Sequence, residues 1–159
     1  FNSVRLAAEN FCLSQNNKRI KVVRISNLYG DFFKEQKYFL PNLIINSIKK
    51  KSISLTINKN SKKNYLDVVD AIEIILKIIK TSKYRLYNIA SSNRYSLDFI
   101  SQVIQKHTKC RINYINQKKI YNEPIININR IKKEFNFKSS NNFKESLIKI
   151  ISSKKTKET

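Results

Sequence analysis

Several residue types are scarce in this 159-residue chain, and each scarcity excludes a class of protein. The one glycine, Gly30, excludes a Gly-rich phosphate-binding loop within the chain. Two cysteines, Cys12 and Cys110, and one histidine cannot supply a disulfide framework or a metal site, so we expect structural, buried thiols. No run approaches the ~20 apolar residues that span a bilayer, and no signal-peptide pattern opens the chain. We therefore expect a soluble, cytoplasmic protein.

The chain also has few acidic residues, with 11 Asp and Glu against 32 Lys and Arg and a net charge of +21. Such a charge can indicate a nucleic-acid partner. Only seven of the basic residues are arginine, the residue best suited to bidentate recognition of phosphate and guanine. The basic residues are scattered, and the excess of Lys, Ile and Asn follows AT-rich codon usage. We therefore do not expect nucleic acid as the partner, although a basic polyanion-binding module remains the rival class.

Methionine is absent, position 1 included, so we expect a processed chain or a fragment. The apolar residues that are present alternate along the chain between helical and strand spacing. This alternation predicts an α/β fold with a parallel sheet. Helices are expected at 2–15, 40–51, 67–80, 96–107, 129–135 and 142–151, and strands at 20–25, 53–57, 84–90 and 112–115. The helix at 67–80 has only one narrow polar stripe, so we expect it to be mostly buried.

Six short motifs occur along the chain. None of them is specific alone, but the six together, in this order, are specific. They are FNSVRLAAE (1–9), VRISNLYG (23–30), FLP (39–41), SKKNYLDVVD (61–70), LYNIAS (86–91) with SL (96–97), and NINRIKK (127–133) with FK (137–138). They resemble YxxSKLAAE, LRxxNVYG, FLP, SxxRDFIxVxD, VYNIGS and DISKAKK. The chain therefore resembles the carboxyl-terminal half of the NAD-dependent epimerase/dehydratase family, the extended short-chain dehydrogenases that act on nucleotide sugars.

The resemblance implies a fold and a division of the chain. It implies the carboxyl-terminal part of a Rossmann-like, doubly wound parallel sheet plus a small α/β substrate-binding lobe. Residues 1–30 and 64–90 would belong to the Rossmann-like NAD-binding domain and 31–63 and 91–151 to the lobe, with 152–159 as a basic tail. The implied function is NAD- or NADP-dependent modification of a nucleotide sugar for surface polysaccharide synthesis, with a homodimer as one possible assembly. Because the amino-terminal half of the family is missing, we expect the chain to be inactive alone.

The resemblance also identifies degenerate catalytic positions. Phe1 and Arg5 stand where the family has its catalytic Tyr and Lys. Phenylalanine has no ionisable hydroxyl, so the family's proton transfer cannot proceed as written. Arg5 could still donate hydrogen bonds to the cofactor ribose. The alternative is an ordinary helix start in which Arg5 pairs with Glu9 at i,i+4.

Four further positions are implied to bind ligands. Ser26 would lie beside the nicotinamide, and Asn27 and Tyr29 would contact the substrate just beyond a parallel strand. A loop that satisfies only its own backbone is the alternative. Lys63 replaces an Arg that grips the diphosphate, or is simply a solvated lysine. Glu123 falls near another phosphate-binding Arg of the family, and a carboxylate there would repel phosphate.

The departures at Phe1 and Arg5 leave a second function open. A catalytically dead pseudoenzyme would retain the nucleotide-sugar lobe for binding or regulation. It would differ from an enzyme in binding the ligand without turnover.

Overall fold

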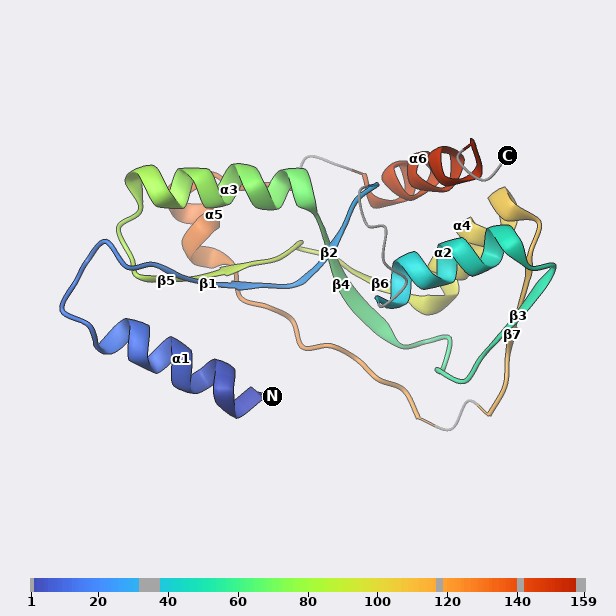
Figure 1. Cartoon of the computed structure of the whole chain (residues 1–159), viewed down its shortest axis with the longest axis horizontal. Coiled ribbons are helices and arrows are strands. Elements are labelled where there is room, and N and C mark those ends of the chain that lie inside the picture. Colours follow the sequence, from blue (N-terminus) through green and yellow to red (C-terminus); the bar gives the residue numbers. More distant parts are fainter. Residues whose placement is uncertain (1, 32–37, 117–118, 140–141, 157–159) are drawn as a thin grey trace.

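The computed structural model of the chain describes residues 2–31, 38–116, 119–139 and 142–156, and Phe1 lies outside them. Figure 1 shows helices packed around strands that run through the middle of an elongated molecule. In chain order the elements are α1 (Asn2–Ser14), β1 (Val22–Ile25), β2 (Asn27–Tyr29), α2 (Phe39–Lys49), β3 (Ser52–Leu55), β4 (Lys62–Asp67), α3 (Val68–Thr81), β5 (Leu86–Ile89), β6 (Arg94–Ser96), α4 (Leu97–Thr108), β7 (Arg111–Tyr114), α5 (Asn129–Phe135) and α6 (Phe143–Thr156).

The strands pair mainly in parallel, which confirms the predicted α/β class. Strand β1 pairs in parallel with β5, and β3 pairs in parallel with β7. Strand β4 pairs in parallel with β2 along one part of its length and antiparallel with β6 along another. The β-branched residues of β1 favour an extended strand, although β1 is only partly covered, with Arg24 and Ile25 exposed.

Two hydrophobic clusters share strand β4. Side chains in a strand alternate between the two faces, so adjacent residues can serve different cores. Leu66 is fully buried in the first cluster, together with residues of α3, β5 and α5. Tyr65 is 5% exposed in the second cluster, which joins α2, α4 and α6. Figure 1 shows β4 running between these two groups of helices.

Helix α5 packs in the first cluster, while the expected division of the chain into domains stays a prediction. The expectation assigned residues 91–151 to the substrate-binding lobe. In the structure, Ile128 and Ile131 are buried in the first cluster, with the helix α3 residues. The chain therefore returns from the second group of helices to the first before α6, as its path in Figure 1 shows.

Helix α3 differs from the prediction that it is mostly buried. Its inner face carries Ile74 and Ile78, each 1% exposed. Its outer face carries four apolar side chains that are at least half exposed: Val69, Ile72, Leu76 and Ile79. The helix packs on strands and α5 along one side only, because nothing in the described part of the chain reaches the other side.

The expected basic tail is helical as far as Thr156, since α6 continues through these residues. The Ser153 hydroxyl donates to Asp31 Oδ2 at 2.6 Å, and Lys154 Nζ lies 3.3 Å from Asp31 Oδ1. A lysine-rich segment without apolar residues gave no sign of this pairing, because Asp31 is remote in sequence. Residues 157–159 lie outside the described part of the chain.

Asp67 links β4 to α3 by capping the helix. Its carboxylate accepts a hydrogen bond from the Val69 backbone N–H at 2.9 Å. We expect Asp67→Ala to lower the free energy of unfolding by about 1 kcal/mol, the usual contribution of such a cap. Urea unfolding followed by circular dichroism would measure it, with Asp67→Asn as the control that keeps a capping oxygen. An equal loss of stability in the two variants would contradict the capping role.

Candidate functional site

A cavity of about 340 Å³ lies where β1 ends and β2 begins. Because parallel strands of open α/β sheets bind ligands beyond their carboxyl ends, this is the expected position for a ligand. The cavity brings together four residues predicted from the sequence, namely Arg5, Ser26, Asn27 and Lys63. Its remaining walls come from the start of α2, from β2 and from β4: Leu28, Tyr38, Phe39, Leu40, Pro41 and Tyr65.

Two interactions from other elements position helix α1, and with it Arg5. The Arg24 guanidinium on β1 binds Glu9, with Arg24 Nε donating to Glu9 Oε2 at 2.8 Å. This bond lowers the pKa of the Glu9 carboxyl. Arg85 donates to the carbonyls of Leu13 at 2.8 Å and Cys12 at 2.6 Å, at the carboxyl end of α1. Glu9 thus bonds to Arg24, whereas the sequence had suggested Arg5 as its partner.

Ser26 has the most distinctive environment among the predicted residues. Its backbone N–H donates to the Ile89 carbonyl at 3.0 Å, which fixes it beside β5. Its hydroxyl oxygen is buried and makes no hydrogen bond within the described residues. A buried polar atom without a partner is costly, so a polar ligand group in the cavity would fit it.

Asn27 and Lys63 share one acidic partner. Asn27 Nδ2 donates to both carboxylate oxygens of Glu123 at 3.0 Å and to the Asn64 carbonyl at 2.9 Å. Lys63 Nζ lies 3.7 Å from Glu123 Oε1 and 5.7 Å above the centre of the Phe39 ring. The lysine therefore has defined neighbours at the cavity wall, which distinguishes it from a merely solvated side chain.

Tyr29 does not line this cavity, and its expected contact with substrate stays a prediction. It is 3% exposed and packs edge-to-face against Phe143, with ring centres 5.0 Å apart. Asn27 and Tyr29 share one face of β2, but Tyr29 lies two residues farther along, where α6 covers the sheet. The segment that follows β1 was also expected to be a loop, whereas Asn27–Tyr29 pairs with β4.

Asn64 is a site-supporting residue that the sequence did not indicate. It is 2% exposed, and its Nδ2 donates to the carbonyls of Ser91 at 2.7 Å and Asn93 at 2.9 Å. Its Oδ1 accepts from the Ser91 N–H at 3.1 Å. The side chain thereby ties β4, next to Lys63, to the loop after β5. No local pattern could have revealed this, because the partners are distant in sequence.

Tyr65 is a tyrosine among the residues that line the cavity. Burial raises the pKa of Tyr65 above its ordinary value, and the negative charge of Glu123 raises the pKa further. The phenol therefore stays protonated at neutral pH and is suited to donate a hydrogen bond. It is poorly suited to the proton-transfer role of the tyrosine that Phe1 replaces, because that role needs a lowered pKa.

The described residues limit which other groups the site can hold. No three of their His, Cys, Asp and Glu side chains lie close enough to bind a metal ion. Cys110 is 2% exposed, and burial raises the pKa of its thiol, whereas Cys12 is partly exposed.

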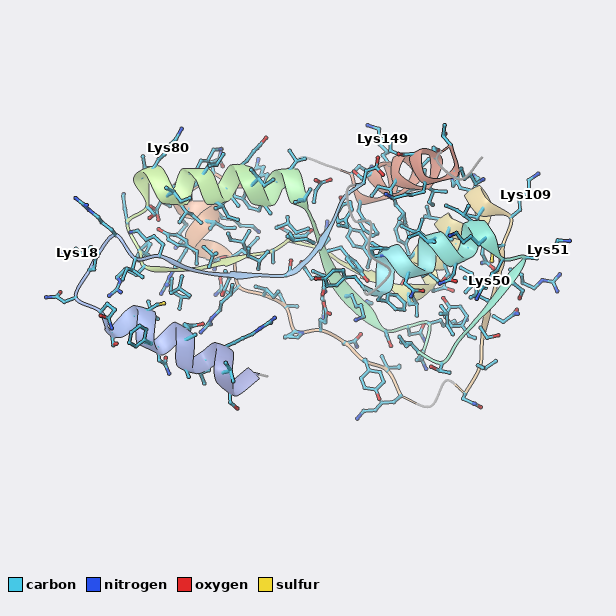
Figure 2. All side chains as sticks on the ribbon, viewed as in Figure 1. Lys18, Lys50, Lys51, Lys80, Lys109 and Lys149 are labelled. Atoms are coloured by element: carbon cyan, nitrogen blue, oxygen red, sulfur yellow. The ribbon has the colours of Figure 1, made fainter. Side chains whose placement is uncertain are left out.

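None of the described helices is long and apolar enough to cross a membrane. Figure 2 shows its six labelled lysines at both ends of the molecule, with Lys18 and Lys80 at one end and the other four toward the opposite end.

Comparisons with known proteins identify the family and the fold of the chain. A model of the NAD dependent epimerase/dehydratase family matches residues 3–90, which is more than half of the chain. No curated protein matches the sequence. Among solved structures, dTDP-glucose 4,6-dehydratase from Bacillus anthracis, in complex with NAD, is 20% identical with a TM-score of 0.84. The match covers 98% of this chain and 52% of that one.

Two other solved structures share the fold. UDP-glucose 4-epimerase from Thermotoga maritima, with UDP-glucose, is 13% identical with a TM-score of 0.80, over 99% of this chain and 52% of that one. RMD from Pseudomonas aeruginosa, complexed with NADPH, is 16% identical with a TM-score of 0.80, over 96% and 55%. The chain thus spans about half the length of these structures. Its sequence and its Rossmann-like α/β fold show that it belongs to the NAD-dependent epimerase/dehydratase family.

Proposed function

We propose that this chain forms the nucleotide-sugar-binding part of an NAD- or NADP-dependent epimerase or dehydratase. The observation that carries the proposal is the cavity that gathers Ser26, Asn27 and Lys63 beyond the end of β1. A cation, an amide and an unpartnered hydroxyl suit a ligand that has both a phosphate group and sugar hydroxyls. The names of the structural relatives, with dTDP-glucose and UDP-glucose among them, support this ligand class.

The cofactor end of the site would involve two residues. Arg5 lines the cavity, and the orphaned Ser26 hydroxyl fits a polar group of a nicotinamide riboside. When bound, the dinucleotide supplies hydride transfer. With one glycine, the chain has no Gly-rich loop of its own for the pyrophosphate. The chain covers about half the length of the solved relatives, and we propose that turnover needs a dinucleotide-binding half in addition to these residues.

A binding protein without catalysis is the second candidate. Phe1 stands at the family's catalytic tyrosine and brings no hydroxyl, and the raised pKa of Tyr65 makes it an unsuitable substitute. In this pseudoenzyme the cavity would bind the nucleotide sugar without converting it. The two candidates share the ligand and differ in turnover.

The cellular setting that we propose is the synthesis of surface polysaccharide in the cytoplasm. Activated sugars appear in the names of the relatives described above, which supports a role in supplying sugar units. A homodimer is the assembly that we propose, on the basis of the family resemblance. Size-exclusion chromatography with light scattering would test it, and a mass of 18.8 kDa would contradict it.

Lys63→Gln is expected to weaken binding of UDP-glucose and dTDP-glucose about tenfold, because a charged hydrogen bond to phosphate is lost. Isothermal titration calorimetry of the 159-residue chain would measure both dissociation constants. Lys149→Gln, which changes an exposed lysine on α6 labelled in Figure 2, is the matched control for net charge. Equal weakening in both variants, or no binding by the unchanged chain, would contradict the proposed function.

A further inference from the structure

Glu123 is held rigidly beside β4 although it lies in a segment without helix or strand. Its backbone N–H donates to the Lys62 carbonyl at 3.0 Å. The Lys62 N–H in turn donates to Asn122 Oδ1 at 3.0 Å, and the Arg94 guanidinium binds the Glu123 carbonyl. These bonds hold the backbone of Glu123 beside β4, and the position of its side chain depends on the groups that the carboxylate contacts.

The Glu123 carboxylate accepts hydrogen bonds from Asn27 and Asn64 and pairs with Lys63 beside the cavity. It accepts from Asn27 Nδ2 at 3.0 Å and from the Asn64 backbone N–H at 2.8 Å. It also forms the ion pair with Lys63 at 3.7 Å. A backbone N–H, a side-chain amide and an ammonium group converging on one anion form a binding site for an oxyanion, and here the oxyanion belongs to the chain itself.

A phosphate group has the same requirements as this carboxylate. Both present oxygens that accept charge-assisted hydrogen bonds, and both are attracted to Lys63. The two cannot use the donors together, because like charges at this distance repel strongly in a partly buried site. The side chains of Lys63 and Glu123 are 33% and 32% exposed, so the ion pair is accessible to a ligand, and Lys63 also lines the cavity.

We propose that Glu123 is a specificity-determining residue that occupies the oxyanion site formed by Asn27, Lys63 and Asn64 and competes with the phosphate groups of the ligand. This inference rests on the proposed function, in which the same donors receive the diphosphate of a nucleotide sugar. A ligand must displace the Glu123 carboxylate before the phosphate group of that ligand can bind. The chain therefore disfavours highly charged phosphates relative to ligands that leave the Glu123 contacts in place.

The test is Glu123→Gln, titrated with inorganic pyrophosphate at physiological salt. The new amide oxygen can still accept from Asn27 and Asn64, so the fold is retained, while the charge that pairs with Lys63 is removed. We expect the variant to bind pyrophosphate about tenfold more tightly than the unchanged chain. In NMR spectra the bound anion should shift the Asn64 backbone amide, and adding Lys63→Gln to the Glu123→Gln variant should abolish the gain.

The matched control is Asp31→Asn, which removes one negative charge from another ion pair, that with Lys154. An equal gain in this variant would show a general effect of net charge and would overturn the inference. So would affinities within twofold for Glu123→Gln and the unchanged chain, or shifts away from Asn64. Thermal unfolding of each variant would establish that it is folded under the titration conditions.

Titration of the same chains with UDP-glucose separates this inference from the proposed function. If Glu123→Gln gains pyrophosphate binding while neither chain binds UDP-glucose, the Glu123 inference holds and the proposed function fails. If both chains bind UDP-glucose with equal affinity and pyrophosphate binding is unchanged, the proposed function holds and the Glu123 inference fails.

Discussion

Phe143→Ala is expected to lower the free energy of unfolding by about 3–5 kcal/mol, the range for truncating a buried phenylalanine. Phe143 is 3% exposed at the start of α6. Its ring stacks on Tyr95 at 4.1 Å and on Tyr65 at 5.6 Å between centres, and it meets Tyr29 edge-on. The substitution therefore removes the side chain that joins α6 to three strands and leaves a cavity among rings.

Chemical unfolding followed by tyrosine fluorescence would measure this loss. Phe11→Ala is the matched control, because Phe11 is 68% exposed on α1 and its removal leaves no cavity. We expect the control to change the free energy of unfolding by less than about 0.5 kcal/mol. A Phe143→Ala chain as stable as the Phe11→Ala chain would contradict the central place of this ring in the core.

Asn64→Leu is expected to lower the free energy of unfolding by about 3 kcal/mol, because several buried backbone groups lose their partners. Leucine has a similar size but can neither donate to the carbonyls of Ser91 and Asn93 nor accept from the Ser91 N–H. Since Asn64 lies next to Lys63, the same change should also weaken ligand binding at the cavity.

The control for Asn64 is Asn113→Leu. Asn113 is exposed, and its side chain donates to the Ser52 hydroxyl at 3.0 Å on the surface. We expect this control to change the free energy of unfolding by less than about 0.5 kcal/mol. Urea unfolding of both variants would compare them, and a loss below about 1 kcal/mol for Asn64→Leu would mean that the buried groups find other partners.

Elements that depend on local sequence were predicted well. Helix α5 spans Asn129–Phe135 as expected, and α4 begins at Leu97, within one residue of the expected start, because the Ser96 hydroxyl accepts from the Phe99 N–H at 3.1 Å. Strands β2, β4 and β6 were missed, because polar residues such as Lys62 and Asn64 give no alternating apolar pattern. Pairing among these three strands, which are distant in the sequence, stabilises them, so no short window contains the signal.

The residues of the candidate site were also predicted only in part. The family motifs identified Arg5, Ser26, Asn27 and Lys63, and the structure gathers these four around one cavity. The roles of these residues stay predictions. The motifs also indicated Tyr29, which α6 covers instead, and they gave no role to Asn64. Glu123 was expected to repel phosphate, but its hydrogen bonds to Asn27 and Asn64 could not be foreseen.

The sequence by itself determined the α/β class, most helices and the family, because these depend on periodicity and on ordered motifs within short segments. Tertiary structure alone decided which residues face the cavity, which tyrosines are buried and what Lys63 pairs with. These outcomes depend on contacts between β2, β4 and the segment around Glu123, which are up to 96 residues apart. Such contacts are fixed by packing and backbone pairing of the whole chain, for which the local sequence carries no pattern.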